Sequence, residues 1–124
     1  MNDLFIDETS NTPAVFFMVK NGILNIVGKC LPEDPVEFFK QIENSLDEFI
    51  NQHSDQLLMI TCEFVYINTS SSKSLYNLLR KAVDNLKKVS IIWGHEEEDD
   101  DMLEQGKDYE DLLGIEFEFR IFSL

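Results

Sequence analysis

The sequence predicts an α/β domain whose mixed sheet begins with an antiparallel hairpin and continues through alternating helices and strands. Three observations lead to this fold class. Short apolar segments alternate with longer segments in which apolar residues recur every three or four positions. Asn21-Gly22 separates the first two apolar segments, as it would in a hairpin. The chain has 124 residues, 44% of them hydrophobic, which suffices for one core, so residues 1–124 are expected to form a single domain.

The hairpin is expected to follow a polar leader. Residues 1–12 lack periodicity and are predicted to be loosely ordered. Strands are predicted at residues 14–19 and 23–28. Between them, Asn21 and Gly22 both accept the positive φ of a type I′ turn, so the two strands should be antiparallel.

The first helix and the strand after it are marked by their sequence patterns. Asp34 is placed to cap a helix, and Pro35 suits the first helical position, where no N–H is needed. The helix is expected to continue to about Asn51. Residues 57–67 are almost continuously hydrophobic, which is typical of a strand buried on both faces of a helix-covered sheet.

The chain then alternates twice more between helix and strand. A second helix has its apolar face within residues 75–86, and a strand follows at residues 89–93. A third helix has its apolar positions within residues 102–113 and ends at Gly114. Residues 115–121 alternate apolar and charged side chains, so the last strand should have one solvent-exposed face. This order implies parallel neighbours in the sheet.

The charge of the chain limits its partners. Its 24 acidic and 10 basic residues give a net charge of −14. Such a surface repels nucleic acid and anionic lipid, so the expected partners are neutral or basic protein surfaces. Cys30 and Cys62 are too few for a disulfide framework and are expected to be reduced thiols. No charged segment followed by an apolar one opens the sequence, and no apolar run approaches the roughly 20 residues of a membrane span. We therefore expect a cytoplasmic protein that is monomeric when free and needs no cofactor.

One segment stands out as a candidate site. It lies where the central strand meets the second helix and contains four hydroxyl-bearing residues between an asparagine and a lysine: Asn68, Thr69, Ser70, Ser71, Ser72 and Lys73. Sites of α/β folds gather at the carboxyl ends of such strands, and a helix N-terminus favours an anion. Lys73 follows Thr69 by one helical turn and could pair with a phosphate there. One of these residues is expected as a helix cap in any case, but four hydroxyls exceed what a cap requires.

Other polar features are weaker. The acidic run at residues 96–101 lacks the spacing of an EF-hand loop, so it is either a solvated loop before a helix or a docking surface for a basic partner. His53 and His95 have no metal-ligand spacing, and no metal is expected. Trp93 ends a buried strand and is most often a core residue in such a place. The candidate docking surface consists of Trp93, His95, Asp101 and Glu104.

Several motifs resemble those of the SiaC-type bacterial regulatory phosphoproteins. The resemblance covers about residues 12–122. The most specific runs are Tyr66-Ile67-Asn68-Thr69-Ser70-Ser71-Ser72-Lys73 and Asp101-Met102-Leu103-Glu104-Gln105-Gly106; Thr12-Pro13, Gly28-Lys29-Cys30-Leu31-Pro32-Glu33 and Trp93-Gly94-His95 also fit. Two departures are Gly94-His95, where an aromatic residue is expected after the tryptophan, and an acidic run longer than expected.

The resemblance implies a STAS-like fold, as in anti-sigma-factor antagonists, and a function in partner switching. A cognate protein kinase would phosphorylate Thr69 and a phosphatase would reverse the modification. The unmodified form would bind and activate a target such as a diguanylate cyclase. A shift of the modified hydroxyl to Ser70 or Ser71 stays open.

Two other functions remain as alternatives. The chain could be a constitutive protein-interaction domain. It could also be a small hydrolase that uses the hydroxyl of Thr69 or Ser70, which would need a general base within hydrogen-bond reach. The Ser70-x-x-Lys73 spacing matches a serine acyl-enzyme motif, but the accompanying S-D-N and K-T-G elements are absent from the sequence.

Overall fold

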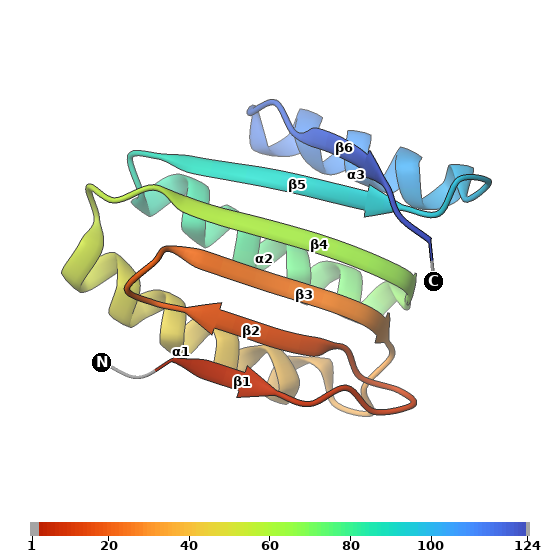
Figure 1. The fold of residues 1–124 in the computed structure, drawn as a ribbon, viewed down its shortest axis with the longest axis horizontal. Helices are drawn as coiled ribbons and strands as arrows, with labels where there is room; N and C mark the ends of the chain where they lie inside the picture. Colours follow the sequence, from red (N-terminus) through yellow and green to blue (C-terminus); the bar gives the residue numbers. More distant parts are fainter. Residues whose placement is uncertain (1–2, 124) are drawn as a thin grey trace.

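The computed structural model describes residues 3–123, and the chain begins with three antiparallel strands. They are β1 (Leu4–Ile6), β2 (Ala14–Met18) and β3 (Ile23–Cys30). The remaining elements, in chain order, are α1 (Pro35–His53), β4 (Leu58–Ile67), α2 (Thr69–Asn85), β5 (Val89–His95), α3 (Asp100–Leu113) and β6 (Glu118–Ile121). The strands form one sheet in the order β1-β2-β3-β4-β5-β6, and β3 to β6 are parallel neighbours (Figure 1). The predicted mixed α/β architecture is confirmed.

The helices cover one face of the sheet and leave the other open. In Figure 1, α1, α2 and α3 all lie behind the sheet. On β4, Leu58, Ile60, Cys62 and Phe64 are fully buried, whereas Met59 between them is 37% exposed. The prediction that this strand is buried on both faces is therefore wrong. Met59, Thr61 and Val65 lie on the face of β4 that points away from the helices. Because these residues are apolar or β-branched, the sequence pattern suggests that they are buried.

An additional edge strand, β1, lies within the segment predicted to be a loose leader. Leu4 to Ile6 pair antiparallel with β2, and the rings of Phe5 and Phe16 meet edge to face at 4.9 Å. The Asp3 carboxylate accepts a hydrogen bond of 2.9 Å from the backbone N–H of Val19. A three-residue strand is too short to show a period, which is why the sequence pattern did not reveal it.

The turn between β2 and β3 differs in type from the prediction, although the antiparallel pairing is confirmed. The N–H of Gly22 donates to the carbonyl of Val19 at 3.3 Å. Gly22 has φ +67°, but within residues 3–123 no residue other than glycine has positive φ, so Asn21 does not take the type I′ conformation. A turn closed by one glycine in the left-handed region is a common longer hairpin connection.

The helices begin and end close to where their sequence signals place them. Asp34 caps α1 by accepting the N–H of Glu37 at 3.1 Å, and Pro35 is the first helical residue, as predicted. Gly114 ends α3 with φ +73°. In the described part of the chain, no helix has the length and apolar character needed to cross a membrane. The likeness to STAS domains stays a prediction.

Candidate functional site

The run of hydroxyl-bearing residues lies at the carboxyl edge of the parallel strands. β4 ends at Ile67, and α2 begins two residues later at Thr69. The run is therefore the first turn of α2, and not a loop that precedes the helix. This placement puts Thr69 at the first helical position, where backbone N–H groups have no partner within the helix and the helix dipole is positive.

Asn68 is the residue that caps α2. Its side-chain oxygen accepts the N–H of Ser71 at 2.9 Å, and its own N–H donates to the carbonyl of Cys30 at 3.1 Å. The second bond joins the start of α2 to the end of β3. Since Asn68 alone provides the side-chain cap, the four hydroxyls after it are not needed for this purpose.

The four hydroxyl side chains differ in accessibility. Thr69 and Ser70 are exposed, and Ser71 is fully buried. Ser72 is half-buried, and its hydroxyl donates to the carbonyl of Asn68 at 3.0 Å. A modifying enzyme can therefore reach Thr69 and Ser70 in the folded protein, but it cannot reach Ser71.

Two side chains of α3 hold the first turn of α2. Gln105 donates from Nε2 to the Ser72 hydroxyl at 2.9 Å and to the Tyr109 hydroxyl at 3.1 Å. Tyr109 in turn donates to the Ser72 carbonyl at 2.6 Å. Burial raises the pKa of Tyr109, so its hydroxyl stays protonated and keeps this donor role. The turn that carries Thr69 is thereby fixed to a second helix.

Trp93 in turn fixes α3 to the sheet. Its indole N–H donates to the carbonyl of Met102 at 2.8 Å, and its ring meets Tyr109 edge to face at 5.4 Å. A Cβ at Gly106 would lie 2.7 Å from Nε1 of Trp93. Only glycine at this position lets the helix backbone approach the indole so closely. The glycine of the run at residues 101–106 thus has a packing role.

The candidate docking surface is wrong in half of its members. Trp93 is fully buried and His95 is only 7% exposed, with its Nδ1 at 2.8 Å from the carbonyl oxygen of Glu96. Trp93 is buried because α3 covers it through Met102 and Tyr109, and β5 itself lies between β4 and β6. Asp101 and Glu104 are exposed on α3 and remain available to a partner.

The acidic run has a structural role at the start of α3. Asp99 caps this helix by accepting the N–H of Met102 at 3.0 Å. Asp100 and Asp101 occupy its first turn, where negative charge is favourable. Among residues 3–123, no group of three or more His, Cys, Asp or Glu side chains is arranged to hold a metal ion.

A shallow groove of about 540 Å³ adjoins the exposed threonine. It runs between α2 and α3 and is lined by Thr69, Ser72, Lys73, Tyr76, Asn77 and Tyr109. Lys73 is exposed, and within the described residues it forms no ion pair. The groove therefore offers a free ammonium group and two aromatic rings beside a helix N-terminus.

The hydroxyls lack the surroundings of a catalytic nucleophile. In the described chain, neither Thr69 nor Ser70 is hydrogen-bonded to a His, Asp or Glu side chain. His53 lies at the end of α1, which leads into the start of β4, so it is at the opposite edge of the sheet. Within residues 3–123, these hydroxyls therefore lack the hydrogen-bonded general base that nucleophilic catalysis uses.

Sequence reasoning did not assign the roles of Gln105, Tyr109 and Tyr76. In the sequence, Tyr109 fits the apolar positions of the predicted third helix, and Gln105 belongs to the motif at residues 101–106. A usable signal was present, because the two residues are four apart and so share one face of α3. Two polar tips on an otherwise apolar helix face suggest a buried hydrogen-bond partner on a neighbouring element.

Comparison with known proteins gives a consistent result. A family model described as SiaC family regulatory phosphoprotein matches residues 6–122. A curated relative, an uncharacterised protein of Pseudomonas aeruginosa (strain UCBPP-PA14), is 27% identical over an alignment of 120 residues, and the match covers 94% of each chain. These matches extend over almost the whole chain, including the run at Thr69.

Solved structures have the same fold. The crystal structure of apo-SiaC from Pseudomonas aeruginosa has a TM-score of 0.85 at 26% identity, over 97% of this chain and 99% of that one. A crystal structure of the diguanylate cyclase SiaD in complex with its activator SiaC, from the same organism, has a TM-score of 0.87 at 24% identity, over 97% of this chain and 100% of the matched one.

Proposed function

The chain belongs to the SiaC family of regulatory phosphoproteins, and from that premise we propose that it is a protein-binding regulator switched by phosphorylation of Thr69. In the unmodified state it binds and activates a target protein. A cognate kinase adds the phosphate and releases the target, and a phosphatase removes it. The chain itself acts by binding and not as an enzyme.

The accessibility of the hydroxyl run is the observation that carries this proposal. Thr69 is exposed at the first position of α2, whereas Ser71 is fully buried and Ser72 is engaged with Asn68 and Gln105. A phosphate on Thr69 would face the positive end of the helix dipole, worth about 0.3–1 kcal/mol at an exposed site. Lys73, one turn along the helix, supplies a cation. The folded protein can thus accept the modification without rearrangement.

The same phosphate would oppose a partner that covers the groove. It adds a charge of about −1.5 to −2 and three acceptor oxygens at pH 7. In an interface these groups must be desolvated or matched by donors. A penalty of about 3 kcal/mol would weaken binding on the order of 150-fold, enough to dissociate a micromolar complex.

A diguanylate cyclase is the target class that we propose. SiaC of Pseudomonas aeruginosa activates the diguanylate cyclase SiaD, and it shares the family and the fold of this chain. The net charge of −14 also favours a basic or neutral protein surface over nucleic acid. Before it binds, the free protein is proposed to be a monomer in the cytoplasm.

The test is phosphopeptide mapping of the protein isolated from its native cells, combined with binding of the separated forms to a diguanylate cyclase. We expect phosphate on Thr69, its loss in a Thr69→Ala strain, and cyclase binding by the unmodified form that is weakened at least 100-fold by the phosphate. Ser70→Ala is the matched control and should leave both results unchanged.

Three outcomes would contradict the proposal. Phosphate on Ser70 in place of Thr69 would move the switch by one residue. If residues 68–73 carried no phosphate under any growth condition, the protein would not be a phosphorylation switch but a constitutive interaction domain. Equal cyclase binding by both forms would separate the modification from the interaction.

A further inference from the structure

A cavity of about 400 Å³ lies on the open face of the sheet, away from the groove at Thr69. Its floor is formed by Val27 of β3 and by Glu63 and Val65 of β4; Val27 and Glu63 are partners in the register of these strands. Residues 8–10, between β1 and β2, form one wall. Phe122 and Ser123, after β6, form another, and Figure 1 shows the chain crossing the end of β5 there.

Two glycines keep this cavity open. Gly28 has φ +128°, and a Cβ there would collide with the carboxylate of Glu8. Gly94 lies beside Glu63 in the sheet, and a Cβ there would come within 2.8 Å of Cγ of Glu63 and 2.9 Å of the Phe122 ring. Any larger residue at either position would displace a side chain that lines the cavity.

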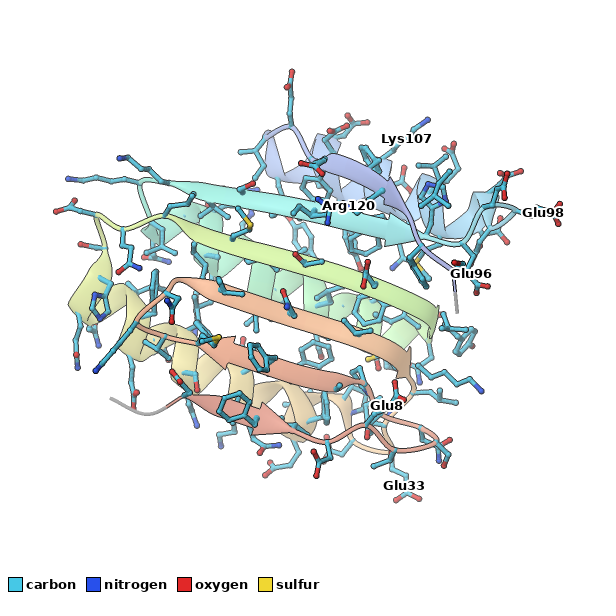
Figure 2. The ribbon with its side chains drawn as sticks, in the orientation of Figure 1. Glu8, Glu33, Glu96, Glu98, Lys107 and Arg120 are labelled. Atoms are coloured by element: carbon cyan, nitrogen blue, oxygen red, sulfur yellow. The ribbon has the colours of Figure 1, made fainter. Side chains whose placement is uncertain are left out.

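The cavity is lined by two carboxylates and one ammonium group. Glu8 and Glu63 line it together with Lys29, and Figure 2 shows Glu8 at the end of the sheet where β3 finishes. Within residues 3–123, neither glutamate side chain forms a hydrogen bond or an ion pair. Arg120, which shares the register row of Glu63 and Gly94, is paired with Glu118 at 2.7 Å. With two glutamates and one lysine, the lining of the cavity has a net negative charge.

We propose that this cavity receives an arginine side chain of a protein partner. Glu63 rises from the floor and Glu8 reaches in from the wall, so carboxylates face the cavity from two elements. A guanidinium carries five donors in a planar fork and can bond to both. The aliphatic stem packs on Val27 and Val65, and the planar head stacks on Phe122.

A protein is the partner that fits the surroundings of the cavity. Phe16, which is 38% exposed, and Met59, which is 37% exposed, lie on the same open face of the sheet. A polypeptide can cover these apolar side chains while one arginine enters the cavity. The net charge of −14 attracts a basic protein surface and repels a second copy of the chain. The volume is near the lower end of the range of roughly 300–1,000 Å³ that is usual for ligand pockets.

The experiment uses the full chain labelled with ¹⁵N and the peptide acetyl-Gly-Arg-Gly-amide as a probe. We expect saturable shifts of the amide signals of Gly28, Glu63 and Gly94. The citrulline peptide, which keeps the shape but lacks the charge, should bind at least tenfold more weakly. Glu63→Gln should also weaken arginine binding at least tenfold, which corresponds to about 1.4 kcal/mol.

Two further variants separate the cavity from general charge attraction. Glu8→Gln changes an exposed loop residue, so the fold should be retained, and it should weaken binding as Glu63→Gln does. Glu97→Gln removes the same charge from the acidic run and should leave binding unchanged. Equal weakening by all three variants, equal binding of citrulline, shifts centred on residues 96–101, or no saturable shift at all would each overturn the proposal.

Discussion

Gly106 and Trp93 determine how closely α3 approaches the sheet. Alanine normally stabilises a helix interior relative to glycine by about 1 kcal/mol. At position 106 we expect the opposite sign, since the added methyl group would lie 2.7 Å from Cγ of Trp93. Gly106→Ala should lower the free energy of unfolding by about 1–3 kcal/mol, the usual cost of overpacking. Chemical denaturation followed by the fluorescence of Trp93 measures it.

The control for this substitution lies two residues away on the same helix. Asp108 is exposed, and Asp108→Ala should change the free energy of unfolding by no more than about 0.5 kcal/mol. If Gly106→Ala instead stabilised the protein, the close contact with the indole would not exist in solution. The role assigned here to the glycine of the 101–106 run would then be refuted.

At the scale of the elements, α2 depends on its cap residue, Asn68. Asn68→Ala removes the hydrogen bond of 2.9 Å to the N–H of Ser71 and should cost about 1 kcal/mol of stability. Asn68→Asp keeps an acceptor at the cap and should retain most of the stability that Asn68 provides. Ser70→Ala, on the same exposed turn, should have almost no effect. Urea unfolding of the three variants gives the comparison, and equal stability of Asn68→Ala and wild type would show that Asn68 is not the cap.

Elements with strong local signals were predictable, and those fixed by tertiary contacts were not. The cap at Asp34 and the left-handed Gly114 follow from local chemistry, and both appear where predicted. β1 was missed because three residues carry no period, and its strand character comes from pairing with β2. The open face of β4 was missed because Met59 and Val65 resemble core residues until the position of the helices is known.

The candidate site shows the same division. The run at Thr69 could be found from the sequence because four hydroxyls exceed the needs of a cap. Which of them is accessible depends on the burial of Ser71 and on the bonds of Ser72 to α3, and these arise only in the folded chain. The cavity beside Glu63 gave no sequence signal at all, since Glu8, Val27 and Phe122 are brought together from distant segments.

At the scale of the whole molecule, the sheet separates two surfaces with different properties. The helix side holds the core, and its carboxyl edge carries Thr69. The open side carries the cavity and the exposed rings of Phe5 and Phe16. A regulator of this shape could contact two proteins or two parts of one protein at once. The arginine probe and the phosphate mapping address these surfaces separately, so one proposal can fail without the other.

The buried titratable groups make a prediction for the whole fold at alkaline pH. Burial raises the pKa of the Cys30 thiol from 9.0 to about 11, and burial also raises the pKa of Cys62 and of Tyr109. The unfolded chain loses the two thiol protons above about pH 9 and the Tyr109 proton above about pH 10, while the folded chain keeps them. The unfolded state then binds fewer protons, so stability falls as pH rises, by up to about 1.4 kcal/mol per pH unit for each group.

Cys30→Ala isolates the contribution of one thiol to this loss. The variant lacks the titration of Cys30 between pH 9 and about 11, so its stability should fall less steeply there than that of the wild type. Deprotonation of exposed lysines affects both proteins equally and cancels in the comparison. Guanidinium unfolding from pH 7 to 11 in a reducing buffer measures both slopes. Parallel slopes would mean that Cys30 titrates as it does in the unfolded chain, and that this end of β3, to which Asn68 is bonded, is open to solvent.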